Sequence, residues 1–378
     1  MPETIRFGAL GSTSTKQIPS CSALTTVRSS KPSRPQSWTT RRTRAKPESQ
    51  IPSSSGEITD VLRAAYGLEP VCVETLPRDG LNESLRVVCS SGAFHVKKFS
   101  GRRTADEVSA SLVIGEDVRP LIATPALVFT RGGEPVASHG SACYAVTEWV
   151  EGFSAESDPR ILMMGDRLGA LIATLHGFLL EDTGRFKYLS APAVPDGPAP
   201  SNDAANGSLQ MRHVRRTLQR VKDQLVAPPM DYDCVGPLFG DLWLGSVLVG
   251  RPRSTLWLVD WEFAGIEGCL SEELASFFFR SFLESDGSFD LAGPGASCAL
   301  EYQARMNLPP EIWERVWWNM LFGGYEHLLV HYGAFLQCEP RTLSRRWQLR
   351  MLSRARRLSW LGNGGMECLQ DWAAGSLR

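Results

Sequence analysis

The 378-residue sequence lacks the patterns that mark several large classes of protein. Its nine cysteines include no C-x-x-C pair, so neither a zinc site nor a disulfide framework is indicated, and we expect small buried cysteines in a reducing compartment. No apolar run continues for about twenty residues, and no secretory h-region is present. P-loop, G-x-G-x-x-G, H-E-x-x-H and G-x-S-x-G motifs are also absent. We therefore expect a soluble protein outside these enzyme classes.

A strong excess of one charge is missing from the chain as a whole, but not from its beginning. The formal net charge of -1 argues against nucleic acid or an acidic molecule as the general partner. Residues 1–47 hold nine Lys or Arg against one acid, about +8, so the rest carries about -9. This Ser-, Thr- and Pro-rich stretch has no core-forming apolar run, which predicts a disordered basic tail over residues 1–56 of a cytoplasmic protein. The alternative is a transit peptide for mitochondria or another organelle.

From residue 57 onwards the sequence has the patterns of regular structure. Residues 57–68 have helical spacing, and short β-favouring runs separated by turn residues follow, which indicates an antiparallel meander. The expected elements are strands over 71–77, 84–91, 93–99, 127–131 and 142–150, and helices over 104–116, 160–180 and 209–226. We predict an α+β protein with a small β-rich lobe (57–152), a larger helical lobe (153–366) and a C-terminal tail (367–378).

Two stretches of the helical lobe place acids in apolar surroundings. Asp241 stands among large apolar residues in "PLFGDLWLGSVLVG", and the apolar run of "LWLVDWEFAG" ends in Asp260 and Glu262, which an extended chain would point the same way. Such acids are costly unless a positive group meets them, and Mg²⁺ held by one or two carboxylates is a suitable partner. The alternative is that Asp241 and Asp260 cap turns and that Glu262 is exposed.

The order of these residues matches that of a kinase catalytic loop, in which an aspartate is followed five residues later by a metal ligand and then by a metal-binding aspartate after a later strand. Asp241, Ser246 and Asp260 stand in this order. "FGDLWLGSVLVG" with "LVDWEFAG" resembles the aminoglycoside phosphotransferase and choline kinase-like superfamily over about residues 57–365. The resemblance implies a two-lobed protein kinase-like fold that transfers the γ-phosphoryl group of ATP to a hydroxyl of a small molecule. It also implies that Asp241 is the catalytic base and that Asp260, Ser246 and Glu262 hold Mg²⁺.

The same resemblance assigns a phosphate-binding lysine. "FHVKKF" is similar to the family strand that supplies it, which makes Lys97 the better match and Lys98 the alternative. Neighbouring strand residues face opposite ways, so only one of them reaches the phosphates. Glu107, early in the next helix, would pair with that lysine. For all three residues the alternative is a solvated surface position.

Further nucleotide contacts follow from two loops. "LPRDGLNES" stands where the family covers the nucleotide, with Gly80 allowing close backbone approach and Asn82 near phosphate, although an ordinary hairpin turn would use the same residues. "VTEWVEG" resembles the linker between the lobes, where backbone groups of Glu148 and Val150 would meet the adenine edge. His176, in "LGALIATLHG", matches a family position that we interpret as a packed structural histidine.

Two departures from the family pattern keep other functions open. Phe239 replaces the histidine that normally precedes Gly-Asp, and Ser246 replaces the usual asparagine. The subgroup that resembles methylthioribose kinase also has Gly-Ser and D-x-E at these points. The main alternative is a catalytically inactive nucleotide-binding or scaffold protein. A protein kinase-like enzyme ranks third, because an A-P-E segment and an activation loop of the usual length are absent.

The resemblance implies that the partner is a small hydroxyl compound, whose identity the sequence does not specify, and no pattern indicates an oligomeric state. Residues 341–357 hold seven arginines and no acid. We interpret them as a solvated helix face rather than as a nucleic-acid surface. No membrane partner is expected.

Overall fold

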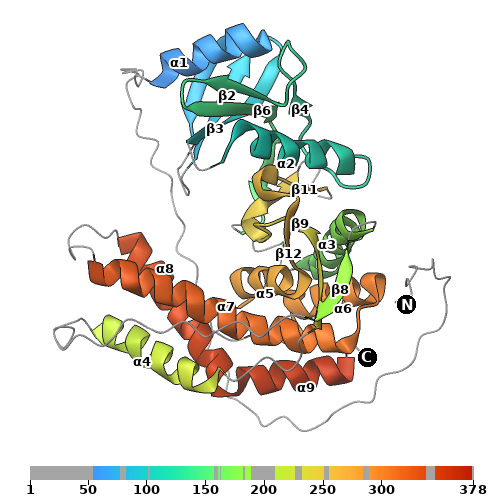
Figure 1. Ribbon diagram of the computed structural model, residues 1–378, viewed down its shortest axis with the longest axis vertical. Coiled ribbons are helices and arrows are strands. Elements are labelled where there is room, and N and C mark those ends of the chain that lie inside the picture. The colour runs from blue at the N-terminus through green and yellow to red at the C-terminus, as the bar shows by residue number, and fades with distance from the viewer. Residues whose placement is uncertain are drawn as a thin grey trace, which may run out of the picture. The chain divides into compact units, whose positions relative to one another are not determined.

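The computed structural model describes residues 54–76, 82–100, 103–156, 161, 163–181, 184–188, 209–225, 232–250, 255–283, 289–337 and 345–376. They belong to one compact unit formed by residues 52–378. The basic segment 1–53 and Gly80 lie outside the described residues. Figure 1 shows strands near the beginning of this unit and helices towards its end, as the sequence predicts for an α+β chain.

The first part is an antiparallel sheet in the order β1-β2-β3-β6-β4, with β5 also paired to β6. Its strands are β1 (Pro70–Thr75), β2 (Glu83–Cys89), β3 (Gly92–Ser100), β4 (Leu127–Val128), β5 (Val136–His139) and β6 (Ala142–Glu148). Helix α1 (Ser54–Val61), which continues as the π-turn η1 (Leu62–Tyr66), packs Ile58 and Leu62 against Leu85 and Val87 of β2. Helix α2 (Ala105–Val118) contributes Val108 to a second cluster with Phe99 and Cys143. The sheet therefore buries alternate residues on both faces, as strand periodicity requires.

The second part is mainly helical. Its helices are α3 (Gly165–Leu180), α4 (Leu209–Gln224), α5 (Leu270–Ser281), α6 (Pro294–Met306), α7 (Pro310–Gln337), α8 (Arg345–Trp360) and α9 (Met366–Ser376), with the π-turn η6 (Leu361–Gly365) between the last two. Two small antiparallel sheets accompany them: β11 (Leu256–Leu258), β10 (Val247–Gly250) and β7 (Gly152–Ser154) form one, and β12 (Ile266–Cys269), β9 (Tyr232–Leu238) and β8 (Arg185–Tyr188) form the other.

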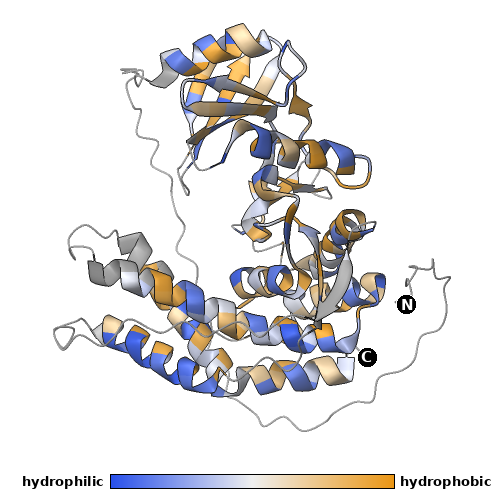
Figure 2. Cartoon of the chain, in the orientation of Figure 1, coloured by the Kyte–Doolittle hydropathy of each residue, from blue (hydrophilic) through white to orange (hydrophobic). Residues whose placement is uncertain are grey.

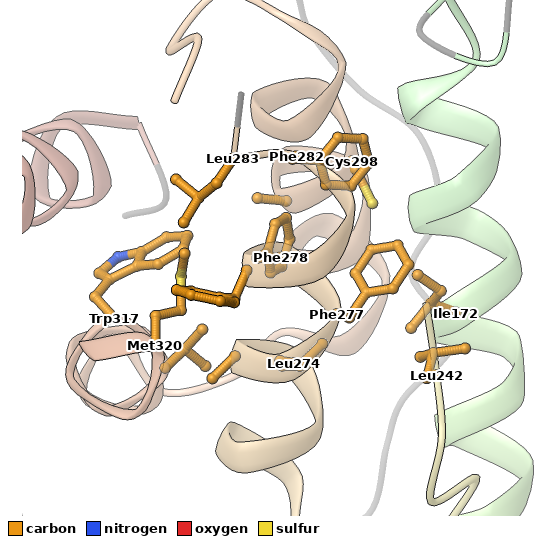
Figure 3. Packing of buried hydrophobic residues seen from close by; sticks show 14 of the residues in the cluster. Ile172, Leu242, Leu274, Phe277, Phe278, Phe282, Leu283, Cys298, Trp317 and Met320 are labelled. Atoms are coloured by element: carbon orange, nitrogen blue, oxygen red, sulfur yellow. The ribbon is translucent and has the colours of Figure 1, made fainter. Parts of the chain in front are cut away.

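The largest apolar core lies between the helices of this part. Figure 3 shows Phe277 and Phe278 of α5 beside Trp317 and Met320 of α7, and the rings of Phe278 and Trp317 are 5.6 Å apart. Burial of aromatic side chains contributes much of the stability of such a core. Helix α5 is thus fixed in place, and its position decides the geometry of the loops that it contacts.

Two basic helices bury their apolar sides. Helix α4 buries Met211, Val214 and Leu218 while Arg212 and Arg216 stay exposed, and Figure 2 shows the two kinds of residue alternating along it. Helix α8, from the arginine-rich segment, buries Met351, Ala355 and Leu358. No helix among the described residues combines the length and hydropathy needed to cross a membrane.

Several sequence-based boundaries need correction. Helix α1 begins at Ser54, inside the segment predicted as a tail, and β4 is shorter than the predicted strand 127–131. The predicted C-terminal tail 367–378 is largely helix α9, which packs because its Leu369 and Ala373 are apolar and buried. Cys72 and Cys368 are exposed, although we expected buried cysteines. The predicted lobe boundary at residues 152 and 153 stays a prediction.

Candidate active site

Strand β3 projects its two neighbouring lysines in opposite directions, as its alternation requires. Lys97 Nζ lies 3.2 Å from Asp260 Oδ1 and also contacts Glu262 Oε2, and 15% of the Lys97 side chain is exposed. Lys98 Nζ instead lies 2.8 Å from Glu57 Oε2 of α1. The structure therefore brings Lys97, and not Lys98, to the predicted metal residues.

The ammonium of Lys97 on one side and the carboxylates of Asp260 and Glu262 on the other stabilise each other's charged forms. Burial by itself lowers the pKa of Lys97, but Asp260 and Glu262 oppose this effect and the net shift is upward. Burial raises the pKa of Glu262, and the ammonium of Lys97 works against that rise. Asn82 Nδ2 also donates to Glu262 Oε1 at 3.2 Å, so the loop before β2 touches the same carboxylate.

Asp260 and Glu262 do not project from an extended strand, contrary to the sequence-based expectation. Strand β11 ends at Leu258, Asp260 has left-handed backbone angles (φ 67°, ψ 47°), and Glu262 lies in the 3₁₀ turn η5 (Trp261–Phe263). The turn still directs both carboxylates at Lys97. A non-glycine residue in the left-handed region is strained, and such strain concentrates at functional sites.

Trp261, between the two acids, anchors this turn. Its ring packs edge-on against Phe239 with centroids 5.1 Å apart, and Trp261 Nε1 donates to Leu258 O at 3.1 Å. The same ring lies against α2 at Gly115, where a Cβ atom would come within 2.9 Å of it. Phe239, which stands in the place of the family histidine, is thus a fully buried packing residue.

Asp241 follows a glycine that the local backbone requires. Gly240 has φ 86°, and a Cβ atom there would lie 2.8 Å from Phe263 Cβ and from its carbonyl oxygen. Asp241 Oδ1 accepts a hydrogen bond of 2.5 Å from Arg280 Nη1 of α5, and the Asp241 side chain is 42% exposed. Sequence reasoning missed Arg280, because a basic residue in the last turn of a helix usually interacts only with the helix carbonyls.

A buried chain of polar groups holds the backbone just before Asp241. Glu273 of α5 accepts hydrogen bonds from the Gly240 N–H (2.5 Å) and the Phe239 N–H (3.3 Å). Its Oε2 also lies 2.8 Å from His176 Nε2, and His176 Nδ1 lies 2.8 Å from the Tyr302 hydroxyl. His176 is fully buried, which agrees with its interpretation as a structural histidine. Sequence reasoning missed Glu273, which lies 32 residues after Asp241.

Ser246 closes the loop after Asp241. Its hydroxyl donates to Trp243 O at 2.7 Å and accepts from the Trp243 N–H at 3.1 Å, within the 3₁₀ turn η4 (Leu244–Ser246). The residue is fully buried. Because the hydroxyl proton and one lone pair are used inside the loop, a single lone pair remains for another partner.

Comparison with known proteins agrees with this geometry. The sequence profile of the phosphotransferase enzyme family matches residues 73–308, which is more than half of the chain. The chain belongs to this family. No curated protein sequence matches it.

Three solved structures illustrate the fold of this phosphotransferase. It resembles a spectinomycin phosphotransferase in complex with ADP and spectinomycin (TM-score 0.51, 11% identity, covering 82% of this chain and 98% of that chain). It also resembles a microcompartment-associated aminopropanol kinase (0.56, 16%, 84% and 98%) and an amicoumacin kinase in complex with AMP-PNP and Ca²⁺ (0.53, 11%, 82% and 93%). At these identities the likeness shows the fold alone, which is the two-lobed protein kinase-like fold.

Glu107 does not make the ion pair predicted for it in this phosphotransferase. Its carboxylate accepts from the Thr104 N–H at 2.8 Å, and its own N–H donates to Thr104 Oγ1 at 3.2 Å, which is a capping box at the start of α2. The hydrogen bond from the Thr104 backbone lowers the pKa of the exposed Glu107 carboxyl. The acids that Lys97 contacts are Asp260 and Glu262.

Glu148 and Val150 stand at the end of β6, where the chain leaves the first sheet. The Glu148 N–H donates to Ala126 O at 2.9 Å, and the Trp149 N–H donates to Ala93 O at 3.1 Å. These bonds fix the linker against the sheet. Because its N–H is used, the backbone of Glu148 has only its carbonyl oxygen to offer a ligand.

A cavity of about 220 Å³ lies between α5 and α7 of the phosphotransferase. Glu272, Phe279 and Arg280 line it from α5, and Asn319 and Glu326 line it from α7. Burial raises the pKa of both glutamates, and Asp233 adds to the rise at Glu272. Arg280 also donates to Asp241, so one guanidinium connects the wall of the cavity with the residue predicted to be the catalytic base.

Proposed function

We propose that this protein transfers the γ-phosphoryl group of ATP to a hydroxyl of a small molecule, with Asp241 as the catalytic base. The observation that carries the proposal is that Lys97 of β3 meets Asp260 and Glu262 from a distant part of the sequence. This group lies close enough to Asp241 for the Asp241 charge to add to the rise that burial causes in the pKa of Glu262. Membership of the phosphotransferase family supports it. The cavity between α5 and α7 is the place for the acceptor.

Lys97 would neutralise phosphate charge on the nucleotide. The carbonyl of Glu148 and the N–H of Val150 would meet the adenine edge, and Asn82, together with Gly80 from the segment outside the described residues, would approach the phosphates. The complexes of two structural neighbours with ADP and with AMP-PNP support a nucleotide in this position. Asn82 already contacts Glu262, so its loop is within reach of the site.

The residues also fit Mg²⁺. Among the described residues, no group of three or more His, Cys, Asp or Glu side chains could hold a metal alone. Mg²⁺ needs only one or two carboxylates plus phosphate oxygens, and Glu262 Oε2 is buried with no hydrogen-bond donor besides the Lys97 ammonium. Asp260 and Glu262 would hold the ion, and Ser246 would add a third oxygen through its remaining lone pair. The bound ion would supply positive charge against the phosphates.

The protein groups then position the reactants. The acceptor hydroxyl gives its proton to Asp241 as its oxygen forms a bond to the γ-phosphorus, and the bond from that phosphorus to the β–γ bridging oxygen breaks, which releases ADP. In such transfers positioning and electrostatics supply most of the rate. Glu273 contributes by holding the backbone at Phe239 and Gly240, which fixes the origin of the Asp241 side chain.

A second candidate is an inactive nucleotide-binding or scaffold protein. Two observations favour it: Ser246 uses its hydroxyl inside the loop, and Phe239 is a packing residue where the family has a histidine. A thermal-shift titration separates the candidates. Stabilisation by ATP that requires Mg²⁺ supports the kinase, since a ligand raises stability with the logarithm of its excess over Kd. No shift at millimolar nucleotide supports the inactive protein.

The decisive experiment replaces the base. A panel of sugars, amino alcohols and nucleoside-derived hydroxyl compounds is screened with ADP release as the readout, and Asp241→Asn is then compared with the parent. We expect kcat to fall by about a hundredfold or more, the usual scale for loss of a general base, with MgATP affinity unchanged. Asp117→Asn, an exposed aspartate on α2, is the control. Equal turnover by Asp241→Asn and the parent would make Asp241 a structural turn residue.

A further inference from the structure

Arg280 is a charged residue in direct contact with Asp241, the predicted base. The family resemblance did not identify Arg280. Its Nη1 lies 2.5 Å from Asp241 Oδ1, and its guanidinium lies over the Trp243 ring at 4.4 Å from the centroid. The Arg280 side chain is 27% exposed and lines the cavity between α5 and α7. One guanidinium thus contacts the base, a loop aromatic and the proposed acceptor cavity.

The end of α5 that carries Arg280 is itself fixed. Arg357 of α8 donates from Nη1 to Phe279 O at 2.9 Å, which satisfies a carbonyl in the last turn of α5. Ser281, which follows Arg280, accepts a hydrogen bond of 3.1 Å from the Leu244 N–H through its Oγ. Helix α5 therefore holds the Asp241 loop at both ends, through Glu273 before Asp241 and through Arg280 and Ser281 after it.

We propose that Arg280 positions Asp241 and donates a further hydrogen bond to the acceptor oxygen during transfer. The inference rests on the proposed function, because it concerns the same base. Arg280 occupies Asp241 Oδ1, so Oδ2 is left to take the acceptor proton. A guanidinium has five N–H groups in a rigid fork, so donors remain after the contact with Asp241.

The charge of Arg280 acts where negative charge develops. As the acceptor O–H gives its proton to Asp241 Oδ2, negative charge develops on its oxygen. The bond that this oxygen forms to the γ-phosphorus then removes that charge, while the bond from the phosphorus to the ADP oxygen breaks. A preorganised donor at such a point stabilises the transition state more than the ground state. Packing on Trp243 keeps the guanidinium in place without using any of its N–H groups.

Three variants test the proposal. Arg280→Met keeps the length and removes the donors, and Arg280→Lys keeps a charge but not the fork. Arg305→Met, which breaks an exposed pair with Glu301 on α6, is the matched control. We expect Arg280→Met to lower kcat about a hundredfold, the scale for loss of one preorganised donor, with MgATP affinity unchanged and Tm lowered only slightly by loss of the partly exposed pair with Asp241. Arg280→Lys should recover part of the rate, and Arg305→Met should match the parent.

Chemical rescue and a stability cycle complete the test. Guanidinium ion at concentrations below those that unfold the protein should restore part of the kcat of Arg280→Ala and none of that of Asp241→Asn. Parental kcat in Arg280→Met, or a loss of rate that only follows a loss of Tm, overturns the proposal. A parent with no turnover of MgATP, by water or by any acceptor, refutes the proposed function instead. In that case Arg280→Met, Asp241→Asn and the double variant are compared by Tm, and additive shifts overturn the positioning contact.

Discussion

One ion pair lies at each end of helix α5, and the two pairs differ in their surroundings. At its beginning, Asp233 of β9 pairs with Arg315 of α7 at 3.2 Å, both fully buried. The same carboxylate accepts from the Ser271 N–H (3.2 Å) and the Cys234 N–H (2.8 Å). At its end, Arg280 meets the half-exposed Asp241. The first pair is enclosed by protein donors, whereas the Asp241 side chain of the second pair is 42% exposed.

The number of protein donors around a carboxylate distinguishes one that only stabilises the fold from one that can bind a ligand or a proton. Residue type alone does not make this distinction. Burial raises the pKa of Asp233, and hydrogen bonds from Ser271 together with Arg315 oppose that rise. The oxygens of Asp233 already accept from protein donors, so they are not available to a ligand. In the group of Lys97, Asp260 and Glu262, by contrast, 41% of the Asp260 side chain is exposed. Only the open group can exchange a protein contact for a ligand.

The largest expected effect on stability comes from breaking the buried pair of Asp233 and Arg315. Asp233→Asn removes the charge of a buried carboxylate that the Arg315 guanidinium contacts, so the free energy of unfolding should fall by about 3–5 kcal/mol. Urea denaturation measures this, with Asp117→Asn on the surface of α2 expected to stay within about 0.5 kcal/mol of the parent. If both variants lose the same small amount, the enclosed pair does not stabilise the fold and the contrast fails.

The next effect concerns ligand binding at the open group. Asp260→Asn removes a charged oxygen from the proposed Mg²⁺ site, so MgATP should bind about tenfold or more weakly, which corresponds to the 1.5–3 kcal/mol scale of a charged contact. Ser246→Ala removes a hydroxyl that is already used inside the loop and should change the affinity less. Calorimetry with MgATP checks both.

Equal and negligible effects of these two variants would remove Asp260 from the metal site. A larger effect of Ser246→Ala would mean that the loop bond to Trp243, or the serine as a ligand, controls binding instead. Thermal stability measured in parallel separates a change at the site from a change in the fold. Asp260→Asn should not lower Tm much, because the Asp260 side chain is partly exposed and Lys97 still pairs with Glu262.

The sequence predicted those parts of the site that depend on local patterns. Strand alternation separated Lys97 from Lys98, and the order of Asp241, Ser246 and Asp260 indicated the fold. Arg280 and Glu273 were missed because they reach the loop from a later helix, and no local pattern encodes that contact. The left-handed angles at Asp260 were also out of reach, since they depend on the packing of Trp261.

The error at Glu107 was avoidable. Thr104 and Glu107 have the S/T-x-x-E spacing of a capping box directly before an apolar helical segment, which is a stronger local signal than a distant lysine. The C-terminal error has a similar origin. Leu369 and Ala373 are four residues apart, the spacing of one helix face, in a stretch that we predicted as a tail.

The smallest expected effects come from the two lysines of β3, compared with each other. Lys97→Met should weaken MgATP binding and also lower Tm modestly, because the buried Glu262 carboxylate loses the Lys97 ammonium. Lys98→Met should leave MgATP binding unchanged and lower the free energy of unfolding by at most about 1 kcal/mol, because the Lys98–Glu57 pair is partly exposed and screened by solvent. Reversal of this pattern in calorimetry would place Lys98, not Lys97, at the nucleotide.

The pH dependence of Lys98→Met sharpens this last comparison. Hydrogen bonds from Lys98 and Tyr144 hold the pKa of Glu57 below its ordinary value of 4.5. A carboxyl with a lowered folded-state pKa contributes stability above its unfolded pKa and loses it as the pH falls through the folded value. The parent should therefore be the more stable protein near pH 7, and the difference from Lys98→Met should shrink as the pH falls below 4.5. Urea midpoints measured between pH 7 and pH 3 check this. A constant difference across that range would mean that Lys98 stabilises the fold through packing against Tyr144 of β6, whose ring centroid lies 5.5 Å from the Lys98 Nζ, rather than through the charge of Glu57.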